Sequence, residues 1–108
     1  MSPGQVYNMI AVSYMAKGRK DLALETIIAG LEIAPREIDL HVNAATIYAG
    51  RQEIDKGNQH MQAALQFATP TYASNLHSAA RVMDSINQQD AAAAFRRRAD
   101  SLLARNDV

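Results

Sequence analysis

Residues 7–35 read YNMIAVSYMAKGRKDLALETIIAGLEIAP, two apolar segments separated by the short polar run KGRKD. The first segment places apolar and aromatic residues at the i, i+3, i+4, i+7 spacing of one helix face: Tyr7, Ile10, Ala11 and Tyr14. Gly18 lies where this helix is expected to stop, and a second helix is expected from near Lys20 to just before Pro35. Because the connection is short, the stretch predicts two antiparallel helices in contact. Upstream, Ser2 and Pro3 predict the helix start, as a capping hydroxyl followed by a first-turn proline.

The same pattern returns 34 residues later. The recurring pairs are Tyr14 and Tyr48, Ala23 and Gly57, Ile27 and Met61, and Gly30 and Ala64. Pro35 recurs as Pro70 after 35 residues, so a third unit begins one residue late, near Ala73. Its two helices are predicted from two further apolar sets: Leu76, Ala79, Ala80 and Met83, then Ala92, Phe95, Ala99 and Leu102. Three helix pairs therefore account for nearly the whole chain.

This repeat resembles the tetratricopeptide repeat (TPR), whose outline is W-x2-L-G-x2-Y, then A-x3-F, then P. The first unit matches best, with Tyr7, Ile10-Ala11, Tyr14, Gly18, Ala23, Ile27 and Pro35. The third matches least, because Phe95 comes one residue early and no proline closes it. The resemblance implies an all-α fold, a right-handed α-α superhelix of about six antiparallel helices. It implies one domain, residues 1–108, with repeats at about 4–37, 38–72 and 73–106.

Small residues at matching positions predict places where helix axes approach closely. In the first two units these are Ala11, Ala23 and Gly30, and Ala45, Gly57 and Ala64.

Composition excludes several classes of function. Eleven basic and eleven acidic residues give a net charge of zero, so neither nucleic acid nor an anionic membrane is expected as the main partner. The run Arg96 to Arg98 fans around a helix rather than forming a stripe, which also argues against a nucleic-acid site. No apolar run approaches the roughly 20 residues of a membrane span, so no membrane insertion is expected. The location is expected to be cytoplasmic if Met1 is the natural start, and periplasmic or exported if the chain is an excised domain.

No enzyme, metal or cofactor is expected. The chain has no cysteine, and its three histidines, His41, His60 and His77, lack a second ligand at helical spacing. His41 takes the aromatic position of its repeat, which favours packing, His60 is expected near solvent, and sequential repeats are expected to keep the three apart. The five glycines are isolated, so no phosphate-binding loop is present, and the acidic residues are expected in turns or on outward faces.

The resemblance implies a protein–protein interaction scaffold that binds a peptide or partner protein on the concave face, built by the first helix of each pair. The residues expected there are Asn8, Met9, Val12, Met15, Asp39, Asn43, Thr46, His77 and Arg81. Asn43 takes a position where the family often has an asparagine that hydrogen-bonds a peptide backbone. Of the clamp used by chaperone-binding members only Asn43 is present, so chaperone tails are not expected as ligands.

An alternative starts from the first helix, which is apolar on most sides. The end of a helical array normally carries a polar outer face, so this helix is expected to be covered by upstream repeats or by a second copy of the chain. This predicts a structural or oligomerisation segment that uses the first repeat, and it predicts that lysine at Met9 and Met15 breaks the assembly.

Overall fold

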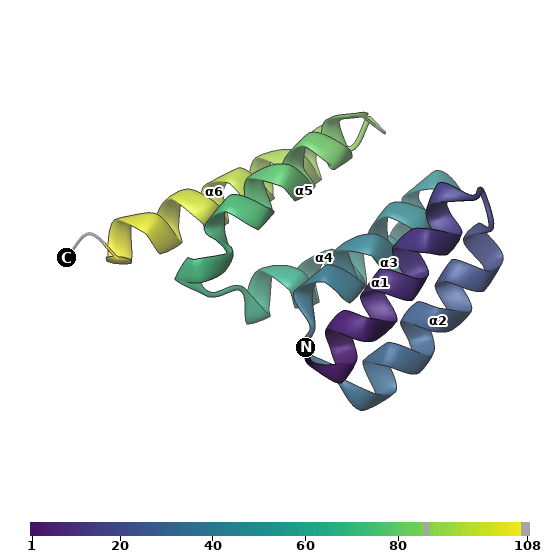
Figure 1. The fold of residues 1–108 in the computed structure, drawn as a ribbon. Coiled ribbons are helices and arrows are strands. Elements are labelled where there is room, and N and C mark those ends of the chain that lie inside the picture. Colours follow the sequence, from purple (N-terminus) through teal and green to yellow (C-terminus); the bar gives the residue numbers. More distant parts are fainter. Residues whose placement is uncertain (86, 107–108) are drawn as a thin grey trace. The chain divides into compact units, whose positions relative to one another are not determined.

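The part of the chain that the structure describes folds into six α-helices. The computed structural model describes residues 1–85 and 87–106, with side chains at all of these except 74, 75, 105 and 106. The helices are α1 (Pro3–Ala16), α2 (Lys20–Ile33), α3 (Ile38–Gly50), α4 (Ile54–Phe67), α5 (Ala73–Ser85) and α6 (Gln89–Asn106), with a short 3₁₀ helix, η1 (Pro70–Tyr72), before α5 (Figure 1). No strand occurs within the described residues. The predicted all-α fold of about six helices is thereby confirmed.

Two compact units divide the chain, Met1–Ala64 and Leu65–Val108. The first, called unit 1 here, contains α1, α2, α3 and most of α4, and unit 2 contains the end of α4, η1, α5 and α6. Within unit 1, α1 and α2 pack together and both contact α3, and within unit 2 α5 packs on α6. The single domain of residues 1–108 and its superhelical form stay predictions.

The turns between paired helices repeat the same backbone geometry. One residue of each turn has a positive φ: Gly18 at 75°, Gln52 at 62° and Asn87 at 63°. In each turn the next residue's N–H donates to a carbonyl five residues back: Arg19 to Tyr14, Glu53 to Tyr48, and Gln88 to Met83. This is the hydrogen bonding of a helix C-terminus closed by a left-handed residue. Because the three turns are 34 and 35 residues apart, the helical repeat is present in the backbone as well as in the sequence.

Local signals set the ends of the first two helices. The Ser2 hydroxyl accepts a hydrogen bond from the Gln5 N–H at 3.3 Å, and the Gln5 side chain accepts one from the Ser2 N–H at 2.9 Å. This reciprocal pair satisfies two N–H groups that a helix start otherwise leaves unpaired. At the other end α2 stops at Ile33, before Pro35, as predicted.

The core of unit 1 lies between α1, α2 and α3. Ala11, Ala23 and Ile27 are fully buried in it together with Leu40 and Ala44. Tyr7, Tyr14, Met15 and Leu31 pack against it. The predicted small residues are all buried, in agreement with close helix approach: Ala11, Ala23, Gly30, Ala45, Gly57 and Ala64. One residue of the predicted core face differs. Ile10 is 44% exposed, because the α1 face toward α2 and α3 is narrower than the run of apolar residues.

Unit 2 has its own core, made by the residues predicted for the third helix pair. Leu76, Ala79, Ala80, Met83, Ala92, Phe95, Ala99 and Leu102 are all buried. Arg98 of α6 adds a polar link, since its Nε donates to the Leu65 carbonyl at 3.1 Å. That carbonyl lies in the last turn of α4, where helix carbonyls lack a partner within the helix.

Candidate functional site

Two of the predicted partner-binding residues are in direct contact. Asn43 of α3 donates a hydrogen bond through its Nδ2 to the Oδ1 of Asn8 on α1, at 2.7 Å, and both side chains are half-buried. The bond is possible because α1 and α3, the first helices of consecutive pairs, are in contact in unit 1. We call the surface that α1 and α3 present around this bond the α1–α3 face.

The amide pair keeps hydrogen-bonding capacity for another molecule. Among the described residues, Asn8 Nδ2 and Asn43 Oδ1 have no hydrogen-bond partner of their own. An asparagine amide has two N–H donors and one carbonyl acceptor, so the pair offers N–H groups on one side and an acceptor on the other. Turning both amides over would exchange these roles and leave the same combination.

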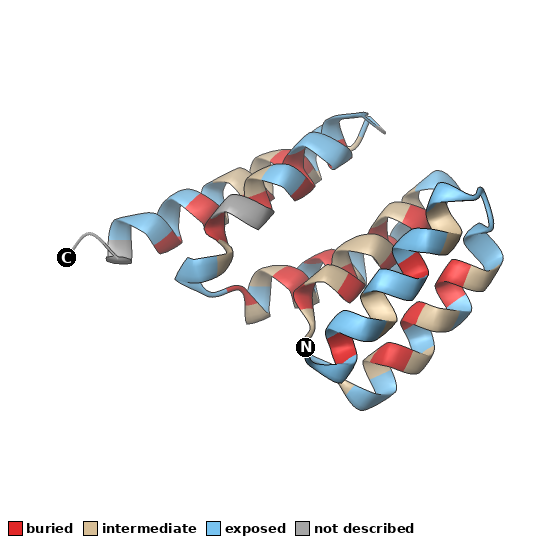
Figure 2. Ribbon diagram, viewed as in Figure 1, coloured by how far each residue is buried: buried red, intermediate tan, exposed pale blue. Residues whose placement is uncertain are grey.

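Apolar side chains of α1 adjoin the pair. Met9 is 57% exposed and Val12 is 46% exposed, and both lie within one helical turn of Asn8. Met15 is different, because it is half-buried and packs against the core of unit 1. Figure 2 shows exposed residues along much of α1. Of the three apolar residues predicted for the face, two are accessible and one mainly supports the fold.

The α3 side of the face is polar. Asp39, Asn43 and Thr46 follow one another at helical spacing, and all three are half-buried. The Thr46 hydroxyl donates to the Val42 carbonyl at 2.9 Å. Asp39 also acts on its neighbour Glu37: burial, and secondly the charge of Asp39, raise the pKa of the Glu37 carboxyl above its ordinary value.

The remaining predicted residues, His77 and Arg81, belong to α5 in unit 2. His77 Nε2 lies 3.7 Å from a carboxylate oxygen of Asp100, and Arg81 donates to the Ser78 hydroxyl at 3.2 Å. Both contacts are exposed, where such pairs contribute little to stability. The structure thus assigns the predicted binding residues to two units: seven to unit 1 and these two to unit 2.

His41 and His60 were expected to lie apart, and the structure corrects this. Their Nδ1 atoms are 3.0 Å apart, and His41 Nε2 lies 2.7 Å from the Pro35 carbonyl oxygen. The expectation was wrong because α3 and α4 form one hairpin, so the two histidines belong to the same repeat. The expected packing role of His41 is compatible with its burial, as only 8% of it is exposed.

The two rings face each other as a hydrogen-bonded pair, not as ligands of one metal ion. Their ring centroids are 5.3 Å apart. Two imidazole rings whose Nδ1 atoms are 3.0 Å apart reach this centroid separation only when each Nδ1 points at the other ring. Nitrogens that share a metal ion would instead point at a common centre beside the line that joins them. No group of three or more metal-binding side chains occurs among the described residues either.

A sequence signal for this pair existed. Gly57 packs against Ala45 and Tyr48 across the α3–α4 contact. His60 follows Gly57 by one turn, and His41 precedes Ala45 by one turn, on the facing sides of antiparallel helices. Matching the small residues across one hairpin would therefore have placed His60 against His41.

Two of the three consecutive arginines serve the fold of unit 2. Arg96 pairs with Asp84 of α5, and Arg98 binds the Leu65 carbonyl. Arg97 is exposed, whereas Arg96 and Arg98 are half-buried. Such engagement fits the expectation that this run is not a nucleic-acid site, which stays a prediction.

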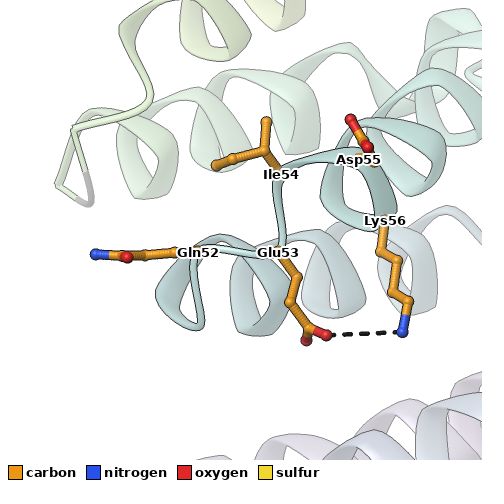
Figure 3. A pocket seen from close by; sticks show the side chains of 5 residues that line it. All are labelled: Gln52, Glu53, Ile54, Asp55 and Lys56. Carbon is orange, nitrogen blue, oxygen red and sulfur yellow. Dashed lines mark ion pairs between the residues drawn. The ribbon is translucent and has the colours of Figure 1, made fainter.

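A shallow hollow of about 390 Å³ lies at the turn between α3 and α4 (Figure 3). It is lined by five consecutive residues, Gln52 to Lys56, and Lys56 makes an ion pair with Glu53 at 3.6 Å. All five are exposed or half-buried, so the hollow does not shield a ligand from water as binding pockets do.

Searches against protein-family models, curated proteins and solved structures found no match to the chain. Membership of the TPR family therefore stays a prediction from the motif. Among the helices of the described residues, none combines the length and the apolar character needed to cross a membrane.

Proposed function

We propose that the chain is a protein-interaction module that binds an extended segment of a partner protein on the α1–α3 face. The observation that carries the proposal is the Asn8–Asn43 amide pair, which is half-buried, fixed by its own hydrogen bond and still able to bond outward. A peptide group presents one N–H and one carbonyl, the complement of what the pair offers. The proposal assigns no catalysis and no cofactor to the chain.

The surroundings of the pair suit such a ligand. Met9 and Val12 offer exposed apolar area on α1, and methionine adapts to differently shaped side chains. Thr46 and Asp39 give the α3 side a polar border. Backbone recognition by fixed amides, with affinity from apolar contacts, is a common mode of peptide binding.

The test uses random peptides displayed on phage and selected against the full chain. Selected peptides are synthesised, and their dissociation constants are measured with the wild type, Asn43→Ala and Asn58→Ala. Asn58 is an exposed asparagine of α4 away from the pair, so it controls for the substitution itself. Loss of one hydrogen bond should weaken binding by about 1–2 kcal/mol, roughly five- to thirtyfold, in Asn43→Ala alone. If every selected peptide binds Asn43→Ala and the wild type equally well, the proposed site is wrong.

A second candidate function is self-association through α1. The observation in its favour is that Val6, Met9, Ile10 and Val12 are all exposed and that α1 contains no charged residue. A face without charge can meet a second copy of itself without repulsion between like charges.

Mass in solution decides this second candidate. The pair of substitutions Met9→Lys and Val12→Lys should convert an oligomer to a monomer, since each introduces a charge into the contact. Val12 replaces Met15 in this test because Met15 packs against the core. Ile33→Lys, at an exposed apolar residue of α2, is the control. Light scattering that finds the wild type monomeric at all concentrations would exclude self-association.

A further inference from the structure

The His41–His60 hydrogen bond fixes which ring nitrogen carries the proton in each histidine. The Pro35 carbonyl can only accept, so His41 Nε2 must carry a proton to bond it at 2.7 Å. In a neutral His41 the Nδ1 is then an acceptor. His60 must therefore donate from its own Nδ1 across the 3.0 Å contact. His60 is thus assigned the Nδ1–H tautomer, which is the less common form of histidine in water.

The hydrogen-bonded histidine pair can take up one proton beyond its neutral state, but not two. A first added proton can occupy the outer nitrogen of His60 and leave the hydrogen bond intact. A second added proton places an N–H on both Nδ1 atoms, so that two donors and two positive charges face each other at 3.0 Å. The doubly protonated pair cannot keep this contact, and the rings must separate.

Several groups surround the pair. Tyr48 of α3 stacks on His60 with ring centroids 5.6 Å apart, and Lys56 of α4 lies over the Tyr48 ring, 5.7 Å from its centroid. The Pro35 carbonyl, in the loop before α3, accepts from His41 Nε2. The charged groups nearest along the chain are Arg36, Glu37 and Asp39 at the start of α3 and Glu53, Asp55 and Lys56 at the turn into α4, and the charged residues of α2, Lys20, Asp21, Glu25 and Glu32, are exposed. None of these groups removes the limit on the pair, because N–H groups on two facing Nδ1 atoms cannot keep a 3.0 Å contact.

We propose that the His41–His60 bond is a proton-operated latch between α3 and α4, closed while the pair holds at most one extra proton and released by the second. Its release removes a side-chain hydrogen bond that joins α3 to α4. Since both helices belong to the same hairpin, acidification should loosen this hairpin before it affects α1 and α2.

Protonation of the pair is unfavourable in the folded state from the first proton on, and the second proton adds the repulsion between two facing N–H groups. Burial, and secondly the neighbouring His41, lower the pKa of the His60 imidazole below its ordinary value of 6.5. A group with a lowered pKa of this kind stabilises the folded state fully above 6.5. That contribution is lost as the pH falls through the lower, folded-state pKa. The hairpin should therefore lose stability between neutral and mildly acidic pH.

The experiment measures unfolding of the full chain in urea between pH 5 and pH 8, followed through the backbone amide signals of α3 and α4 in NMR spectra. The wild type should lose stability as the pH falls. His60→Asn should lose less, because the asparagine Nδ2 keeps a donor toward His41 but does not titrate. His77→Asn, at the half-exposed histidine of α5, is the matched control and should keep the wild-type dependence of these signals.

A second measurement does not depend on how any variant folds. Nitrogen chemical shifts of the histidine rings in the wild type report the tautomers directly. Near pH 8 they should show Nε2–H for His41 and Nδ1–H for His60. The Nε2–H form of His60, or a His60→Asn curve parallel to that of the wild type, would overturn the latch.

Discussion

Glu37 lies at the N-cap of α3, close to the start of α1 in unit 1. A Cβ added to Gly4 would meet a Glu37 carboxylate oxygen at 2.9 Å, which shows how near the two segments are. The raised pKa of Glu37 means that the folded state favours the protonated carboxyl more than the unfolded chain does. Its contribution to stability is present below the ordinary value of 4.5 and is lost as the pH rises through the raised pKa.

Glu37→Gln should therefore stabilise unit 1 at neutral pH and have little effect below pH 4.5. The glutamine keeps the size of the side chain and removes only the charge. Urea unfolding of both proteins at the two pH values measures the difference. A glutamine variant that is equally stable to the wild type at neutral pH would mean that Glu37 is not held in an unfavourable environment.

For single residues, the sequence predicted the helix face on which a side chain lies better than it predicted which other side chains it contacts. The resemblance placed Asn43 on the face, but its bond to Asn8 depends on how far α1 is shifted along α3, and the repeat period does not determine that shift. The resemblance placed Met15 on the same face, and the structure adds that this half-buried side chain also packs against the core of unit 1. Spacing assigns a residue to a side of a helix, and packing decides whether that side is covered.

At the scale of helices, two glycines of unit 1 give opposite predictions. A Cβ at Gly30 would lie 2.7 Å from the Tyr7 Cβ and 2.9 Å from a Leu40 methyl, both too close. A Cβ at Gly57 would lie 3.6 Å or more from its nearest neighbours, which is ordinary contact.

Gly30→Ala should thus destabilise unit 1 by about 1–3 kcal/mol through overpacking. Gly57→Ala should be neutral or stabilise by up to about 1 kcal/mol, because alanine favours the helix. Thermal unfolding followed by circular dichroism compares the two variants directly. Equal effects of the two substitutions would show that α1 and α2 are not as close at Gly30 as described.

The turns provide a further prediction. Gln52 has a φ of 62°, in the left-handed region that costs a residue with a side chain roughly 1–2 kcal/mol. Gln52→Gly should remove that strain and stabilise the α3–α4 hairpin by about 0.5–1 kcal/mol after the loss of chain entropy. Asn87→Gly should gain less, since asparagine tolerates this conformation. A Gln52→Gly variant that is less stable than the wild type would show that the α3–α4 turn does not have the left-handed geometry of the turn at Gly18.

Helices were the level at which the sequence was most informative. The turn at Gly18 follows from a glycine, which adopts the left-handed conformation at little cost, and the stop before Pro35 follows from the restriction that proline places on the preceding residue. The structure confirms both. The exposure of Ile10 could not be predicted, because apolar residues on two sides of a helix do not reveal which side the neighbours cover.

At the scale of the whole molecule, the repeat continues across two units. The turns at Gly18 and Gln52 belong to unit 1 and that at Asn87 to unit 2, with the same geometry in each. The helices of the two units also differ in charge: α1 carries no charge, whereas α6 carries Arg96, Arg97 and Arg98 on exposed or half-buried positions. The proposed peptide site needs only α1 and α3, so it depends on unit 1 alone.

The measurement that tests the proposed function most directly is an NMR titration of the isotope-labelled chain with the tightest peptide from the phage selection. The account predicts shifts of the side-chain amide signals of Asn8 and Asn43, together with backbone signals of α1 and α3. Signals that move instead in α5 and α6, while both asparagine amides stay unchanged, would contradict it.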